Sequence, residues 1–379
     1  MGFLNGRVTF TRYRVGGESP LPFGEELLEQ VEAHAIGKHG MGDAADGITV
    51  GWAGGNHVLD LTFGVEKNLL TDALHLAMRI DTDKIPGDLL RAYTRIETDA
   101  RAHLNPSGFA NKAQKQEAKE AARVRAEAEA ADGRFRRRKH IPILWDGQSN
   151  VLYAGTNSAS VLDRLQGLFR ETFDRNLEPI TSGSLAAERN DSYFAPIAYI
   201  GNDPDAVGQV AWAESDPTRP DYWGNEFLMW LWHTLQNDSD TITLSDDSEV
   251  TVMLAKTLTL DCPRGMTGSD SLKDEGPAKL PEAFRALQSG KLPRKTGLIL
   301  VRHGIQYDLT LQAETLAVSG LALPKVEGAV GTDAQIARIE SLRHLVETLD
   351  LLYDAYGRRR TGPDWAGNLG RIRQWLTAA

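Results

Sequence analysis

The chain has 379 residues, of which 41% are hydrophobic and 25% are charged, and its formal net charge is −10. These values are ordinary for a globular protein with a sizeable core, and the length suits two or three domains. The single cysteine, Cys262, excludes an intrachain disulfide and a cysteine metal cluster, and without an apolar leader or a long apolar run we expect a cytoplasmic protein with no membrane partner.

The first hundred residues predict alternating strands and helices. Val8–Val15 alternates with a period of two, which is typical of a strand, and residues 23–36 place apolar side chains at helical spacing. Residues 59–63 and 73–80 are apolar enough for two further strands. A helix is expected from Lys84-Ile85-Pro86 to about residue 104.

Residues 105–140 are the most distinctive stretch. After the opening Asn105-Pro106-Ser107-Gly108, strong helix formers fill it, with no further proline and with no glycine until Gly133. Four cations recur on one side of such a helix: Lys112, Lys115, Lys119 and Arg123. Five more follow it closely: Arg134, Arg136, Arg137, Arg138 and Lys139. The stretch therefore predicts a polar helical arm with a cationic edge.

Charge is distributed unevenly along the chain. Residues 101–140 contain 11 Lys and Arg and 5 Asp and Glu, a local net charge of +6, so the remainder carries −16. This contrast suggests a polyanion that is held at one place and repelled elsewhere. A solvated helix followed by a basic turn explains the charges equally well on these grounds alone.

The rest of the chain continues the mixed pattern. A hairpin is expected at 141–153 around Asp146-Gly147, and an amphipathic helix at 158–173. Residues 223–235 predict a helix whose large aromatics belong to the core rather than to a cofactor site. The remaining expectations are hairpins at 242–260 and 298–311, a polar loop at 265–278, helices at 281–287 and 334–356 (the longest), and a last amphipathic turn at 365–376.

This order of elements predicts an α+β fold of two lobes with antiparallel sheets. We expect the first lobe at 1–182, with the basic helical arm 105–140 protruding from it. The second lobe is expected at 183–356, and a basic, amphipathic tail at 357–379.

Two enzymatic interpretations have weak support. Arg302-His303-Gly304 resembles the Arg-His-Gly motif of the histidine phosphatases, but that motif normally stands near the N-terminus, and here a charged turn between two strands is favoured. A metal-dependent nuclease needs clustered carboxylates, and Asp246-Asp247 is better explained as a hairpin turn. We therefore predict no catalytic residue, metal site or cofactor.

The chain resembles the recombination-associated RdgC family, in its longer branch, nearly from end to end. The strings that carry the resemblance are Gly51-Trp52, the segment 111–120, the hairpin 141–153, the helix 161–173, Glu178-Pro179-Ile180, the segment 223–232, Gly290-Lys291-Leu292, and the strands 296–301 and 307–311. Residues 184–220 and the tail after Tyr356 depart from the short branch of the family.

The resemblance implies an elongated, curved subunit and a ring-shaped homodimer that encircles duplex DNA without sequence specificity, limits recombinase access and associates with the nucleoid. We expect nine cations of the arm, the four on one side of the helix and the five that follow it, to face phosphates, since Lys and Arg contacts to phosphate do not read sequence. Four further candidates lie in the second lobe: Arg264, Lys291, Arg294 and Lys295. A protein-interaction scaffold, in which the arm meets an acidic protein, is the remaining alternative.

Overall fold

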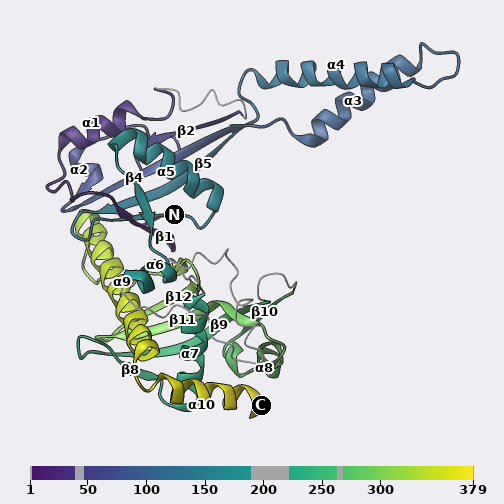
Figure 1. The fold of residues 1–379 in the computed structure, drawn as a ribbon. Coiled ribbons are helices and arrows are strands. Elements are labelled where there is room, and N and C mark those ends of the chain that lie inside the picture. Colours follow the sequence, from purple (N-terminus) through teal and green to yellow (C-terminus); the bar gives the residue numbers. More distant parts are fainter. Residues whose placement is uncertain (1, 39–46, 189–221, 263–267, 379) are drawn as a thin grey trace. The chain divides into compact units, whose positions relative to one another are not determined.

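The computed structural model describes residues 2–38, 47–188, 222–262 and 268–378 (Figure 1). Its α-helices are α1 Glu25–Ala33, α2 Val65–Asn68, α3 Gly87–Ala102, α4 Lys112–Ala130, α5 Ala159–Phe173, α6 Ser182–Glu188, α7 Trp223–Asn237, α8 Pro281–Gln288, α9 Gly331–Thr361 and α10 Trp365–Ala378. Its strands are β1 Val8–Val15, β2 Ile48–Ala53, β3 Leu69–Leu70, β4 Ala73–Asp83, β5 Arg136–Asp146, β6 Val151–Ala154, β7 Leu177–Pro179, β8 Thr241–Thr243, β9 Glu249–Asp261, β10 Ser269–Asp274, β11 Leu292–Arg302, β12 Ile305–Gln312 and β13 Val318–Ala322.

The described residues form a mixed α+β fold around one open antiparallel sheet of thirteen strands. The strand order is β10-β9-β11-β12-β13-β1-β6-β5-β4-β2, with β3, β7 and β8 paired to β4, β1 and β9. The predicted α+β class and antiparallel pairing are confirmed. Two compact units are distinguished: Met1–Gly24, Glu66–His75 and Pro142–Ala379 make up the larger, and Glu25–Val65 and Leu76–Ile141 the smaller. The predicted domain boundaries stay predictions.

The core of the larger unit is built around α7. This helix is apolar on nearly every side, and every residue from Trp223 to Thr234 is buried, as expected for a helix inside a protein. Phe227 packs against Tyr353 of α9 with ring centroids 5.4 Å apart, and Trp230 packs against Tyr356 at 5.6 Å. The prediction that these aromatics belong to the core is confirmed.

Two glycines permit close approaches of backbone within a unit. A Cβ atom on Gly224 of α7 would lie 1.8 Å from the carbonyl oxygen of Ala313, and one on Gly51 of β2 would lie 2.5 Å from the backbone of Ile36. Any larger side chain would force the segments apart. The Gly51-Trp52 string therefore has a packing role, with the Trp52 side chain fully buried beside it.

The predicted hairpin at 141–153 and the helix after it are confirmed. β5 and β6 pair with Ile143 opposite Ala154 and Asp146 opposite Val151. Trp145 packs on Phe169 and Phe173 of α5, with centroids 5.4 and 5.5 Å apart. The hairpins around Asp246-Asp247 and Arg302-His303-Gly304 are confirmed as well.

The prediction of a strand at 59–63 is wrong. The Asp60 carboxylate accepts hydrogen bonds from the backbone N–H of Asn56 and of Thr62, which closes a local turn in place of sheet pairing. Leu59 and Leu61 are consequently exposed, at 62% and 45%. The apolar composition of residues 59–63 predicted a strand that does not form.

The prediction of a polar loop at 265–278 is wrong in part, because this segment contains the strand β10. This strand pairs with β9 from Ser269 opposite Asp261 to Asp274 opposite Lys256. It lies at the edge of the sheet and has few buried side chains, so its composition resembles a loop. The strand β13 was also not predicted. The longest helix, α9, is confirmed, and it extends at both ends beyond the expected 334–356.

Candidate nucleic-acid interface

The two helices α3 and α4 of the smaller unit form an antiparallel hairpin. Its direction follows from the contacts along it: Tyr93 donates a hydrogen bond to Glu129 near the base, and Asn105 donates one to Gln114 at 2.6 Å near the turn. The side of α4 that faces α3 consists of Ala118, Ala122 and Ala126, all fully buried. Small side chains let the two helix axes lie close together, so the longer polar side chains point outward.

The start of α4 is defined by its own side chains. The Asn111 side chain accepts a hydrogen bond from the Gln114 N–H at 2.9 Å, and the Gln114 side chain accepts one from the Asn111 N–H at 3.0 Å. This reciprocal capping box satisfies two donors that a helix end otherwise leaves open. It establishes the register of the helix, and therefore the direction in which its lysines project.

The predicted cationic edge lies on the exposed surface of α4. Lys112, Lys115 and Lys119 are exposed and form no ion pair with any residue that the structure describes. Arg123, also exposed, pairs with Glu127 at 2.7 Å, one turn further along the helix. Three of the four cations are therefore available to an external anion without breaking an internal contact.

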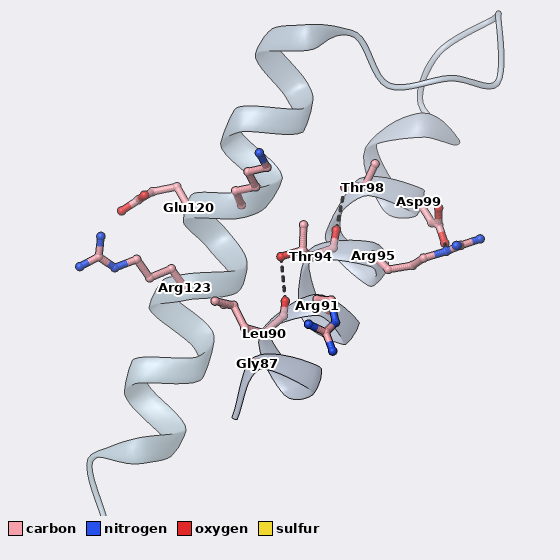
Figure 2. Close-up of a pocket in the computed structure, with 10 residues that line it drawn as sticks. Gly87, Leu90, Arg91, Thr94, Arg95, Thr98, Asp99, Glu120 and Arg123 are labelled. Atoms are coloured by element: carbon pink, nitrogen blue, oxygen red, sulfur yellow. Dashed lines mark hydrogen bonds and ion pairs between the residues drawn. The ribbon is translucent and has the colours of Figure 1, made fainter. Parts of the chain in front are cut away.

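A groove of about 1040 Å³ runs between the two helices of the hairpin. Figure 2 shows Arg91 and Arg95 on α3 and Arg123 on α4 among its lining residues. With Lys119 they give four cations, against the two carboxylates of Asp99 and Glu120. The lining residues are Gly87, Leu90, Arg91, Thr94, Arg95, Thr98, Asp99, Lys119, Glu120 and Arg123.

Sequence reasoning did not include the two arginines of α3 in the site. Arg91 pairs with Asp88, and Arg95 lies 3.6 Å from Asp99, and all four side chains are largely exposed. Exposed pairs of this kind contribute little and are readily exchanged for another anion. Their spacing of four residues in a predicted helix was the available signal, since it places both on one face.

The cluster of five cations that follows α4 is mostly paired with carboxylates. Arg134 contacts Asp132 at 2.7 Å and Glu129 at 2.9 Å. Because Arg136–His140 begins strand β5, alternate side chains project to opposite faces. Arg136 and Arg138 face the acidic end of β4, whereas Arg137 and Lys139 are exposed and form no ion pair within the described parts of the chain.

The pairing of Arg136 has an electrostatic consequence. Its guanidinium lies 2.8 Å from Asp83, and this hydrogen bond lowers the pKa of the Asp83 carboxyl below its ordinary value. Near neutral pH the carboxylate is therefore ionised and offsets the arginine. Arg138 lies 3.9 Å from Asp81, which also pairs with Arg79 at 2.5 Å. These acids reduce the positive potential around Arg136 and Arg138.

The candidates predicted for the second lobe lie in varied surroundings. Lys291 pairs with Asp270 at 2.6 Å, and Arg294 pairs with Asp261 at 2.8 Å and with Glu314 at 2.9 Å. Lys295 is exposed, and Arg264 lies outside the described residues. The carboxylates beside Lys291 and Arg294 compete with any phosphate for these cations. Their DNA-binding role stays a prediction.

The Arg302-His303-Gly304 string occupies the turn between β11 and β12. His303 and Gly304 have φ angles of +51° and +76°, as a tight hairpin turn requires. The buried Arg302 guanidinium contacts Asp246 at 2.5 Å and Glu347 at 2.8 Å. This arginine is therefore committed to two carboxylates rather than directed into an open phosphate pocket.

Comparison with known proteins finds no family model that matches the chain and no significantly similar curated protein. Among the described residues, no helix combines the length and the apolarity needed to cross a bilayer. Nor do these residues contain a group of three or more His, Cys, Asp or Glu side chains arranged to hold a metal ion.

Proposed function

We propose that this protein binds DNA without sequence specificity, through the α3–α4 hairpin. The observation that carries the proposal is the row of exposed cations on α4, of which Lys112, Lys115 and Lys119 have no ion pair with a described residue. Flexible lysine ammonium groups contact phosphate oxygens as point charges and do not distinguish bases. A helix rigidified by its capping box presents them at regular intervals.

The groove between α3 and α4 extends the proposed phosphate-binding surface. Arg91 and Arg95 add two guanidinium groups, each of which can donate two parallel hydrogen bonds to a pair of phosphate oxygens. Arg137 and Lys139 continue the positive charge onto β5. The acidic remainder of the chain, with a net charge of −16, disfavours binding elsewhere on the surface.

The wider role that we propose follows from the resemblance to the RdgC family. In this proposal two elongated, curved copies, each with two lobes and a protruding hairpin, close into a ring around duplex DNA. The ring limits access of a recombinase, and the protein is associated with the nucleoid. A single hairpin supplies few phosphate contacts, so two copies on one duplex add avidity.

The proposal is tested by reversing charge on the exposed edge of α4. We expect Lys115→Glu with Lys119→Glu to weaken binding to two unrelated duplexes by the same factor. Loss of two phosphate contacts reduces the slope of log K against log salt by about 2. Fluorescence anisotropy with labelled duplexes across a salt series measures both quantities.

The matched control reverses two exposed lysines of the larger unit, Lys279→Glu with Lys325→Glu, which changes the net charge equally. We expect it to leave affinity nearly unchanged. Equal losses in both double variants would indicate a general charge effect, and wild-type affinity in the α4 variant would remove the hairpin edge from the site. Incubation of the duplexes with Mg²⁺ separates this proposal from a nuclease, which would shorten them.

A further inference from the structure

Two histidine side chains face each other on the surface of the larger unit. His303 lies in the exposed turn between β11 and β12, and His344 lies on α9. The Nδ1 atom of His303 is 3.4 Å from the Nε2 atom of His344, and the ring centroids are 5.6 Å apart. The residues are 41 positions apart in sequence and are brought together by the packing of α9 on the sheet.

The tautomer of His344 follows from its other neighbours. Tyr307 has its hydroxyl 3.1 Å from the carbonyl oxygen of Ser341 and 2.9 Å from Nδ1 of His344. The hydroxyl has one proton, and the carbonyl can only accept, so the tyrosine donates to Ser341. The tautomer of His344 that matches this arrangement has its proton on Nδ1 and donates it to the tyrosine oxygen. Nε2 is left with a lone pair directed toward His303.

We propose that His303 and His344 form a binding site for a divalent transition-metal ion that prefers nitrogen ligands, such as Zn²⁺. Zinc–imidazole bonds are about 2.0–2.1 Å long, so two such nitrogens at a tetrahedral angle are about 3.4 Å apart. The observed separation of 3.4 Å matches this spacing. Water or an external ligand completes the coordination, because the protein supplies two ligands.

The surroundings of the pair orient its imidazole rings. A metal ion binds the unprotonated nitrogen of an imidazole, and Nε2 of His344 faces Nδ1 of His303. Tyr307 supplies the outer hydrogen bond that orients a ligating imidazole. Glu347, one turn along α9, offsets part of the added positive charge, although its carboxylate contacts Arg302 at 2.8 Å.

The site is tested by isothermal titration calorimetry, in which Zn²⁺ is added to the purified full-length protein. The titration is carried out at pH 7.5 and repeated at pH 5.5. We expect a saturable site that requires both histidines and takes up less Zn²⁺ at the lower pH, because protons compete with a metal ion for histidine nitrogens. His303→Asn removes the imidazole while tolerating the positive φ angle of the turn. His344→Gln removes the second ligand. The matched control, His103→Asn, removes an exposed histidine on the α3–α4 hairpin and should retain the site.

Tyr307→Phe distinguishes a built site from a chance pair of histidines. Loss of the hydrogen bond to Nδ1 should weaken Zn²⁺ binding roughly 10-fold or more without abolishing it, as expected for an outer partner of a metal ligand. A wild-type protein that takes up no Zn²⁺ would overturn the proposal, as would undiminished binding in both His303→Asn and His344→Gln. DNA affinity is measured separately on His303→Asn, His344→Gln and Tyr307→Phe and is expected to remain at the wild-type value.

Discussion

Glu226 shows how much one buried charge depends on its partner. The side chain is fully buried in α7, where its carboxylate accepts hydrogen bonds from Arg360 at 2.9 Å and from Tyr356 at 3.1 Å. The Arg360 guanidinium also lies over the Trp223 and Trp365 rings, 5.3 and 5.4 Å from their centroids. A buried ion pair of this kind contributes little net stability, whereas the removal of one of its two partners is strongly destabilising.

Glu226→Gln keeps the shape of the side chain and removes the negative charge that faces Arg360. We expect the free energy of unfolding to fall by about 3–5 kcal/mol, because the guanidinium stays buried. Urea denaturation at neutral pH measures the change. Glu32→Gln, which removes a half-exposed pair with Lys38, is the control and should cost less than about 1 kcal/mol. Similar losses in the two variants would contradict the assignment.

At the scale of elements, the α3–α4 hairpin is held by few apolar contacts. No residue of α3 is buried, and α4 buries only alanines. Several large apolar side chains of the hairpin are instead exposed, among them Leu104 at 80% and Phe109 at 79%. Helical stability here relies on alanine-rich propensity, ion pairs and capping rather than on a core. The hairpin is therefore sensitive to changes at its helix ends.

Asn111→Ala removes the capping box at the start of α4. We expect the local stability of this helix to fall by about 1 kcal/mol, because the Gln114 N–H loses its side-chain acceptor. Hydrogen exchange should accelerate for amides in the first turn and remain unchanged in α7. Gln116→Ala, an exposed change on the same helix, provides the comparison. If both variants exchange at the same rate in that turn, the box does not stabilise it.

At the scale of the whole molecule, the distribution of charge separates a basic segment from an acidic remainder. Residues 101–140 carry +6 and the rest of the chain −16. Such a distribution allows attraction to a polyanion at one surface while the protein keeps a net negative charge. The carboxylates beside Arg134, Arg136 and Arg138 reduce the number of available cations below what the sequence suggests.

The proposed complex has a characteristic dependence on salt. If about five phosphates are neutralised, the slope of log K against log salt is near −4.5. We expect the same slope on different duplex sequences, and a mass of twice the chain mass in sedimentation equilibrium. A slope near zero would contradict phosphate binding. A chain that sediments as a monomer at the concentrations where it binds DNA would contradict the proposed ring but not the hairpin site.

Patterns within single elements were sufficient to predict most helices and hairpins. The helix over 158–173, the aromatic helix α7 and the hairpins of β5–β6, β8–β9 and β11–β12 have periodic apolar positions and clear turn residues. The errors fall where that signal misleads or is absent. Leu59 and Leu61 alternate but are exposed, and β10 pairs at a sheet edge with little burial of its own.

The sequence by itself determined the position of the basic helix, the side on which its lysines recur and the charge contrast with the remaining chain, because these depend on local spacing and composition. Only the tertiary structure decided which cations are paired with acids, that Arg91 and Arg95 line the groove with α4, and that His303 meets His344 beside Tyr307. These pairings join residues distant in sequence, so they are set by how helices and strands pack rather than by any pattern along one element.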